Sequence, residues 1–306
     1  MLVGYHKDIC VCEFDLVNFT QWCSSKTPDE IFNCMSLFND RICHLISSYD
    51  DVEKVELVGD SCLLLSRSVE SIIHLCIDIL DNFPCFKEEL FYSDNIDIRI
   101  GIHIGNLTGG ILKSPNKYQV YGQTINIASR LEQLAIPGTI HVSEDVYSIL
   151  KTNNEEILKI FSMGKNKLVN LKGIGDFNSI TLFIKRENCM VADDNKSQVL
   201  ILSHIINKQH NTTCLQITSI TECFELLKKQ YFEDVVILDR FFEDVDAFII
   251  LKDFRLWETQ HRNELQKFIL ISADDSSHLC ESELFICKDA SFYKKFDNAI
   301  RSIKES

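Results

Sequence analysis

The sequence has few basic residues and no long apolar run. Its 306 residues carry 31 Lys and Arg against 45 Asp and Glu, a formal net charge of -14. Nucleic-acid binding depends on neutralisation of phosphates by basic side chains, so this balance argues against a nucleic-acid partner. No apolar segment approaches the roughly 20 residues that cross a bilayer, and the opening MLVGYHKDIC lacks the layout of a signal peptide. We therefore expect a cytoplasmic protein that binds neither nucleic acid nor membrane.

The spacings typical of zinc sites and disulfide frameworks are also missing. The 13 cysteines are scattered and form no C-x-x-C pair, and the histidines show no H-E-x-x-H spacing. Reduced, buried thiols are therefore favoured over a disulfide or zinc framework. What is present is an ordinary globular composition, 45% hydrophobic and 25% charged, in a chain long enough for about two domains.

The first part of the chain predicts alternating strands and helices. A strand is expected over residues 8–17, and Thr27, Pro28 and Glu30 form a capping box that opens a helix. KVELVGDSCLLLS then predicts a β-hairpin that turns at Gly59. A further helix follows the hairpin.

Residues 96–105, IDIRIGIHIG, alternate strictly between isoleucine and other residues. The isoleucines share one face, while Asp97, Arg99 and His103 share the other. Thr124 is expected to cap the helix that follows. The order β-α-β-β-α-β predicts an α+β sheet with helices on one face and the other face free to bind a ligand.

The second part of the chain has a different pattern of apolar residues. Residues 187–197, ENCMVADDNKS, are polar and non-periodic and predict a linker. Beyond them QVLIL, DVVILD and KFILIS are short apolar runs separated by helical patterns, as in the buried parallel strands of a doubly wound fold. The expected domains are therefore residues 1–186, of α+β class, and residues 198–306, a smaller α/β domain.

Two carboxylates of the first domain, Asp15 and Asp60, lie at strand ends or turns. Brought together, they would offer hard oxygen ligands to divalent cations. Each also has an ordinary structural interpretation as a turn residue.

Four further polar residues of the first domain are candidates for a functional site. Asn126 and Arg130 lie i,i+4 on one helix face, Arg99 lies on the polar face of its strand, and Lys172 lies in a Gly-flanked turn. The arginines could pair with surface acids or present guanidinium groups to phosphate, and Lys172 is placed to contact phosphate.

Four segments carry a resemblance to a known family. FDLVNFT, KVELVGDS, IRIGIHIGNLTGGIL and YGQTINIASRLE…IPGTIHVS resemble, in order, the catalytic domain of class III nucleotidyl cyclases over about residues 8–185. The resemblance implies a ferredoxin-like α+β domain in which two divalent metals, Mg²⁺ or Mn²⁺, assist cyclisation of a nucleoside triphosphate. It assigns Asp15 and Asp60 to the metals, Phe19, Thr20 and Arg99 to phosphate contacts, Asn126 and Arg130 to the ribose and transition state, and Lys172 to the terminal phosphates.

The resemblance also implies a head-to-tail homodimer with two equivalent sites. In the family one domain supplies the aspartates and the residue matching Arg99, and the other supplies the base pocket and the residues matching Asn126, Arg130 and Lys172. This chain holds both sets. A catalytically silent nucleotide-binding module is the alternative, but none of the motif residues is missing.

Two positions of the resemblance concern the base. Adenylate cyclases use a Lys with an Asp or Thr, and guanylate cyclases use a Glu and usually a Cys; here Glu56 and Gln119 match. A carboxylate accepts from guanine N1–H and its 2-amino group and fits adenine poorly, so GTP is favoured over ATP. Gln119 departs from the guanylate pattern and keeps UTP or CTP open, as in the pyrimidine cyclases of bacterial antiphage systems that this family includes.

The second domain resembles a receiver domain of two-component systems. Asp239 matches the phosphoacceptor, Ser272 the switch hydroxyl and Lys294 the lysine of that site. Ser203 and His204 follow the expected first strand, where a receiver has acidic residues. We therefore expect a degenerate receiver that serves in regulation or dimerisation.

Overall fold

The computed structural model describes residues 2–93, 95–114, 116–186, 189–242, 245–273, 284–289 and 291–305. The chain divides into two compact units, Met1–Phe183 and Ile184–Ser306. Over the described residues, no helix combines the length and the apolar character that crossing a membrane requires.

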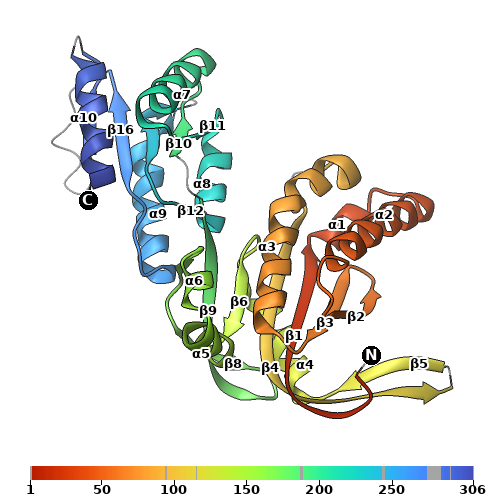
Figure 1. Ribbon diagram of the computed structural model, residues 1–306. Helices are drawn as coiled ribbons and strands as arrows, with labels where there is room; N and C mark the ends of the chain where they lie inside the picture. Colours follow the sequence, from red (N-terminus) through yellow and green to blue (C-terminus); the bar gives the residue numbers. More distant parts are fainter. Residues whose placement is uncertain are drawn as a thin grey trace. The chain divides into compact units, whose positions relative to one another are not determined.

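The first unit is built on a mixed β-sheet in which the long strand β1 (Gly4–Val17) is an interior strand. β1 pairs antiparallel with β3 (Ser61–Ser66) on one side and with β4 (Asp97–Lys113) on the other. β5 extends β4 as a hairpin that reaches away from the rest of the sheet (Figure 1). The remaining strands are β2 (Val52–Val58) beside β3, β6 (Ile140–Ser143) beside β4, β9 (Gly175–Arg186) beside β6, and β5 (Asn116–Tyr121), β7 (Phe161–Met163) and β8 (Lys167–Leu171).

The isoleucine face of β4 is covered by α3 (Val69–Phe86), one of the helices that the sequence predicted. In α2 (Pro28–Ile46) the capping box of Thr27 and Glu30 is present as expected. The predicted hairpin is also confirmed, as β2 and β3. Figure 1 shows α3 alongside the strands, and the sulfur of Cys76 in α3 lies 3.6 Å from that of Cys12 in β1. The other helical segments are α1 (Phe19–Cys23), α3 (Val69–Phe86), the π-helical turn η1 (Lys87–Phe91), α5 (Glu144–Asn153) and α6 (Glu155–Leu158).

The polar face of β4 is not free, contrary to the expectation, because α4 (Gln123–Leu134) packs on it. Gly101 allows this approach, since a Cβ there would lie 2.1 Å from the backbone nitrogen of Glu132. Thr124 is not a cap. It is buried within α4, and its hydroxyl donates to the carbonyl of Asn106 at 2.7 Å.

The second unit contains a five-stranded sheet in the order β11-β10-β13-β16-β17, and all of these strands are parallel. This is the flavodoxin-like order of doubly wound folds, as expected. One apolar cluster lies under α8 and α9 and another under α7 and α10, so both faces of the sheet are covered. The strands are β10 (Cys189–Ala192), β11 (Cys214–Ile217), β13 (Val236–Asp239), β16 (Phe268–Ser272) and β17 (Leu284–Cys287), and the helices are α7 (Lys196–His210), α8 (Ile220–Lys229), α9 (Ala247–His261) and α10 (Phe292–Glu305). Short strands β14 (Phe241–Phe242) and β15 (Val245–Asp246) pair separately.

The expected linker at residues 187–197 contains the first strand of this sheet, so that expectation was wrong. β10 is buried on both faces, with Met190 in one apolar cluster and Val191 in the other. QVLIL, expected as a strand, belongs to α7, where Val199, Leu202 and Ile206 pack at helical spacing. Residues 187 and 188 lie outside the described residues.

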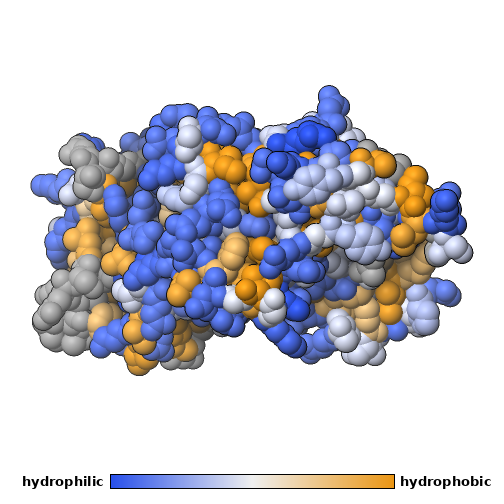
Figure 2. Space-filling model, turned by 90° about the horizontal axis from the view of Figure 1, so that it is seen from below, coloured by the Kyte–Doolittle hydropathy of each residue, from blue (hydrophilic) through white to orange (hydrophobic). Residues whose placement is uncertain are grey.

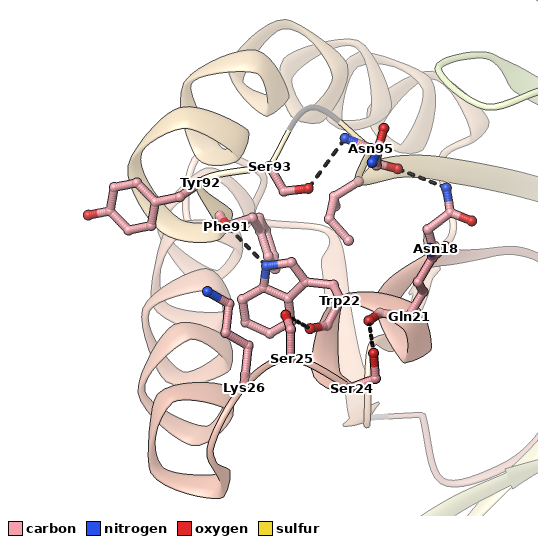
Figure 3. A pocket seen from close by; sticks show the side chains of 11 residues that line it. Asn18, Gln21, Trp22, Ser24, Ser25, Lys26, Phe91, Tyr92, Ser93 and Asn95 are labelled. Carbon is pink, nitrogen blue, oxygen red and sulfur yellow. Dashed lines mark hydrogen bonds between the residues drawn. The ribbon is translucent and has the colours of Figure 1, made fainter.

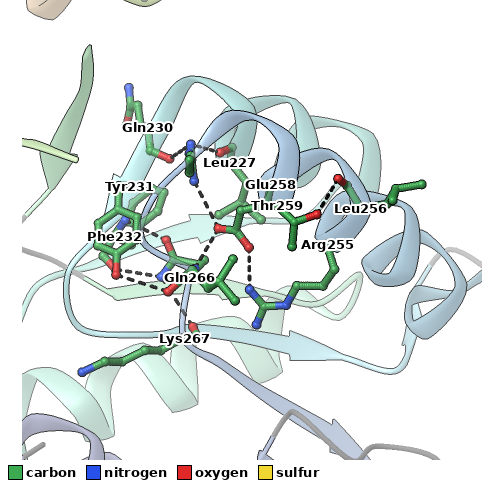
Figure 4. A network of polar contacts seen from close by, with 12 residues as sticks. Leu227, Gln230, Tyr231, Phe232, Arg255, Leu256, Glu258, Thr259, Gln266 and Lys267 are labelled. Carbon is green, nitrogen blue, oxygen red and sulfur yellow. Dashed lines mark hydrogen bonds and ion pairs between the residues drawn. The ribbon is translucent and has the colours of Figure 1, made fainter. Parts of the chain in front are cut away.

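A buried polar network ties α9 to the strand β12 (Gln230–Phe232), which pairs with Ile184–Arg186 at the end of β9. The guanidinium of Arg262, 1% exposed, donates to the carbonyls of Leu227 and Gln230, and faces Glu258. Figure 4 shows the carboxylate of Glu258 in this network, where it also accepts from Arg255 and from the backbone N–H of Gln266. Burial lowers the pKa of Arg262 to about 10. The network satisfies backbone carbonyls where α8 ends and β12 begins.

Candidate functional site

Strand pairing places Asp15 and Arg99 opposite each other on β1 and β4. The Nη2 atom of Arg99 lies 3.4 Å from Oδ2 of Asp15, and both side chains are about a quarter exposed, at 27% and 25%. Asp15 is therefore held in the sheet next to a permanent cation. This pair forms the centre of the candidate site in the first unit.

Asp60 is brought to Asp15 by the β2–β3 turn. Gly59, at φ 64°, allows the tight turn that precedes it. Burial, together with the charge of the Asp15 carboxylate, raises the pKa of Asp60 to about 6. The two predicted metal ligands are thus close enough to repel each other.

Glu132 of α4 belongs to the same cluster, and the sequence reasoning missed it. Its Oε1 lies 2.9 Å from Nε of Arg99, and its side chain is 4% exposed. Burial raises the pKa of Glu132 to about 7, although Arg99 opposes that shift. A signal was available, because Ala128, Leu131 and Glu132 share the buried stripe of α4, where an acid is unusual.

Glu56 and Gln119 lie on β2 and β5. The pairing of β2 with β3 shifts between Lys54 and Glu56, so that Val55 is the extra residue of a β-bulge, a device that re-aims side chains. Glu56 forms an ion pair through Oε2 with Nζ of Lys117, two residues before Gln119. Lys117 was not expected at this position.

Among the described residues, no hydrogen bond or ion pair joins Asn126, Arg130 or Lys172 to Asp15, Asp60 or Arg99, although the charge of Arg130 acts on Glu13 of β1. Asn126 is exposed on α4, and Nη1 of Arg130 donates to Oε1 of Gln133 at 2.6 Å. Lys172 is exposed in the turn between β8 and β9, and glycine at 173, with φ 81°, supports that turn. Within one chain the described contacts therefore join Asp15, Asp60 and Arg99, and none of them includes Asn126, Arg130 or Lys172.

Phe19 and Thr20 begin α1 directly after Asn18, which has a left-handed backbone at φ 63°. A cavity of about 370 Å³ lies on the other side of this helix, between Trp22 and the segment that follows η1. In Figure 3 the indole of Trp22 points to the carbonyl of Phe91, to which it donates at 2.9 Å. The described lining of this cavity includes none of the predicted site residues.

A second carboxylate cluster lies in the second unit, at the carboxyl ends of β10 and β13. Lys288, which follows β17, forms an ion pair through Nζ with Oδ1 of Asp239, and the same Nζ lies 3.6 Å from Oδ2 of Asp193. Ser272 ends the adjacent strand β16 and is buried. Burial raises the pKa of both Asp193 and Asp239. In sheets with this strand order, ligands usually bind at the carboxyl ends of the strands, at the point where the strand order reverses.

This cluster corrects two expectations. Ser203 and His204 lie inside α7 rather than at the end of the first strand, where Asp193 is found. The lysine beside Asp239 is Lys288, whereas Lys294 is exposed on α10. The ground for expecting a degenerate site is therefore removed.

Comparison with known proteins agrees with the architecture of the first unit. Residues 2–186 match the family model described as the adenylate and guanylate cyclase catalytic domain. Guanylate cyclase 32E of Drosophila melanogaster is 28% identical over 189 residues, covering 58% of this chain and 16% of that protein. Guanylyl cyclase C of Sus scrofa is 32% identical over 163 residues, covering 50% and 15%. The chain thus spans about a sixth of the length of these relatives.

Solved structures show the same fold. The guanylate cyclase domain of RhGC from Catenaria anguillulae, in complex with GTP, superposes with a TM-score of 0.53 at 23% identity, covering 60% of this chain and 99% of that one. The adenylyl cyclase CyaB from P. aeruginosa gives a TM-score of 0.53 at 18% identity, covering 60% and 98%. With a family model matched over more than half of its length and the cyclase fold in its first unit, this chain belongs to the class III adenylate and guanylate cyclase family.

Proposed function

We propose that this chain is a nucleotidyl cyclase that converts a nucleoside triphosphate to a 3′,5′-cyclic nucleotide and pyrophosphate, with GTP favoured over ATP. The observation that carries the proposal is the convergence of Asp15, Asp60 and Arg99 in a domain of the cyclase family. Guanylate cyclases among the relatives support GTP.

The donor set at Asp15 and Asp60 fits two divalent ions, Mg²⁺ or Mn²⁺. The mutual repulsion that raises the pKa of Asp60 is relieved when cations lie between the carboxylates. The described residues contain no group of three His, Cys, Asp or Glu side chains suited to a metal. Mg²⁺ is commonly bound by one or two carboxylates together with substrate phosphates, so two aspartates suffice. When bound, the ions would lower the pKa of the attacking hydroxyl and neutralise phosphate charge.

The chain's own cations would position the triphosphate and meet developing charge. Arg99 is held between two carboxylates and presents its guanidinium beside the metal ligands. Arg130 and Lys172 would contact phosphoryl oxygens, with Asn126 orienting the ribose and the Phe19-Thr20 turn facing the phosphates. Protein groups do little covalent work in such a reaction, so positioning dominates.

A head-to-tail homodimer would complete each site, because within the described part of one chain Asn126, Arg130 and Lys172 form no hydrogen bond or ion pair with Asp15, Asp60 or Arg99. Exposed apolar residues on the β4–β5 hairpin, Ile111, Leu112 and Tyr121, offer surface for association. Figure 2 shows hydrophobic residues at the surface on the face seen from below. Mixing Asp15→Ala with Arg130→Ala chains should restore part of the activity through one intact hybrid site. Stable mixed dimers without any recovery contradict this arrangement.

One experiment tests activity and base together. The protein is incubated with each of the four nucleoside triphosphates and Mn²⁺ or Mg²⁺, and products are identified by mass spectrometry. Cyclic GMP as the main product supports the proposal, while cyclic UMP or CMP identifies the alternative, a pyrimidine cyclase, that Gln119 keeps open. No cyclic product under any condition indicates a silent nucleotide-binding module.

The second unit has a candidate function of its own. We propose that Asp239 accepts a phosphoryl group and that Asp193 helps to bind the accompanying divalent cation, in a receiver-like regulatory unit. The ion pair of Lys288 with Asp239 supports this role, since a lysine there would meet phosphoryl oxygens. Treatment with acetyl phosphate and Mg²⁺ should add one phosphate by intact mass, and Asp239→Asn should abolish the adduct. An unchanged adduct in that variant contradicts the assignment.

A further inference from the structure

An acidic side chain lies on the face of β1 that packs against α4. Residues two apart on a strand point to the same side, so Glu13 projects together with Val11 before it and Asp15 after it. Val11 belongs to an apolar cluster that includes Ala128 of α4. An apolar residue at position 13 would continue this contact, whereas a half-buried carboxylate there must be compensated by hydrogen bonds. Glu13 is not among the residues proposed to bind metal, nucleotide or phosphate.

Strand register places Glu13 where α4 comes close to the sheet. Glu13 pairs with Gly101 of β4 and with Leu63 of β3. A Cβ at Gly101 would lie 2.3 Å from the carbonyl oxygen of Ala128 and 2.1 Å from the backbone nitrogen of Glu132, so the backbone of the helix lies against this part of the sheet. Directly opposed residues of antiparallel strands point to the same side, so Glu13 faces this turn of α4.

Two serine hydroxyls from different elements donate to the Glu13 carboxylate. Oγ of Ser61, the first residue of β3, lies 3.3 Å from Oε1 of Glu13. Burial raises the pKa of Glu13, while hydrogen bonds from Ser129 of α4 and from Ser61 oppose that shift, as does the charge of Arg130. Ser61 directly follows Asp60, and Ser129 directly precedes Arg130. Glu13 therefore connects the turn that carries a proposed metal ligand to the helix that carries a proposed phosphate contact.

In the proposed head-to-tail dimer these two elements serve different sites. Asp60 of one chain would complete a site with the partner subunit's Arg130, so Asp60 and Arg130 of the same chain belong to two separate sites. Glu13 holds both elements of its own chain through hydrogen bonds. It would thus lie between the two sites and support one residue of each.

We propose that Glu13 is a positioning residue shared by both sites, which holds the Asp60 turn for metal binding through Ser61 and holds α4 for Arg130 through Ser129. The inference rests on the proposed cyclase function and homodimer, and it deepens both. Glu13 acts through its neighbours and touches no reacting atom. Its loss should therefore impair metal binding in one site and the chemical step in the other.

Glu13→Leu tests the inference in the mixture of Asp15→Ala and Arg130→Ala chains. The one intact site of that dimer takes Arg130 from the Asp15→Ala chain and Asp60 from the Arg130→Ala chain. Glu13→Leu added to the Asp15→Ala chain should lower kcat about fivefold, with an unchanged half-saturating Mn²⁺ concentration. Added to the Arg130→Ala chain, it should raise that Mn²⁺ concentration about fivefold, with a smaller change in kcat. Leucine is similar in size and suits the apolar contact beside Val11, so the chain should fold.

Single serine variants should separate the two effects. Ser129→Ala in the Asp15→Ala chain should reproduce the fall in kcat, and Ser61→Ala in the Arg130→Ala chain should reproduce the rise in the Mn²⁺ concentration. Glu88→Gln, at an exposed position of the first unit, is the matched control and should change neither quantity. A merely structural glutamate would change the same quantity from either chain. That result, or no change from either chain, overturns the inference.

Hydrogen–deuterium exchange of the full chain tests the same role without turnover. In Glu13→Leu the β2–β3 turn and α4 should both exchange about fivefold faster than in the unmodified protein, because each loses a hydrogen bond that holds it. If no nucleotide is cyclised but both segments exchange faster, the cyclase proposal fails and the positioning role of Glu13 stands. If either segment exchanges at the unmodified rate, the inference is overturned whatever the turnover.

Discussion

In both units carboxylates lie together at strand ends, but basic side chains neutralise their charge in different ways. In the first unit Arg99 is divided between Asp15, at 3.4 Å, and the buried Glu132, at 2.9 Å. Asp60 keeps a pKa raised to about 6, so the charge of the aspartate pair is only partly balanced. In the second unit Lys288 pairs directly with Asp239.

The difference teaches which site depends most on added cations. An arginine fixed by two carboxylates cannot move to cover Asp60, so the cluster retains negative charge that divalent ions would neutralise. A lysine on a flexible stem can leave Asp239 when a phosphoryl group arrives and can then contact that group instead. We therefore expect catalysis to depend on the first cluster and regulation to depend on the second.

Asp60→Asn should have the largest effect of the changes that separate the two clusters. Loss of a metal-binding carboxylate is expected to lower cyclase turnover at least about a thousandfold. Asp239→Asn should leave basal turnover within about threefold, because that carboxylate lies in the other unit. Cyclic product is quantified by mass spectrometry, with Asp50→Asn, an exposed aspartate, as control. Equal losses in both variants would remove the distinction between the units.

Glu132→Gln should have a smaller effect on the first cluster. The amide retains a hydrogen-bond acceptor for Nε of Arg99 but removes the charge that holds the guanidinium in place. Poorer positioning of Arg99 is expected to raise KM for the nucleotide about tenfold with a lesser change in kcat. Glu132→Asp, which keeps the charge but shortens the side chain, should have a KM between those of the unmodified protein and Glu132→Gln. A KM unchanged in Glu132→Gln means that Asp15 alone positions Arg99.

The sequence predicted the parts of the first unit that local patterns determine. The alternation over residues 96–105 gave the face of β4 that carries Arg99, and the capping box gave the start of α2. Glu132 and Lys117 could not be placed, because their partners come from other strands through long-range register and a bulge. No local pattern contains that information.

The second unit was harder to predict because its first strand is only four residues long. CMVA is followed directly by acidic and polar residues, so the segment as a whole had the composition of a linker. The true first strand places Asp193 beside Asp239, whereas the strand assumed from QVLIL placed Ser203 there. Assigning the first strand to the wrong segment therefore led to the prediction of a degenerate site, although the predicted fold class was right.

Two buried histidines of the first unit should make its stability depend on pH, and this is the smallest expected effect. Burial lowers the pKa of His103 and of His141 to about 4, and the rings lie 2.9 Å from the hydroxyls of Ser143 and Ser179 respectively. Below pH 6.5 the unfolded chain takes up protons that the folded His103 and His141 do not, so the contribution of these two residues to the free energy of unfolding falls between pH 6.5 and 4 and levels off below. Asp60 and Glu132, whose pKa values are raised to about 6 and about 7 in the folded state, contribute with the opposite sign in this range.

His141→Gln should reduce the slope of the free energy of unfolding against pH by about 1.4 kcal/mol per pH unit. At pH 7.5 the substitution should not increase the free energy of unfolding. The chain has two tryptophans, so Trp257→Phe leaves Trp22 to report urea unfolding of the first unit by fluorescence. His204→Gln, at an exposed position of the second unit, should leave the slope of Trp22 unfolding unchanged. An identical slope in His141→Gln would show that the acid sensitivity of the first unit has another source.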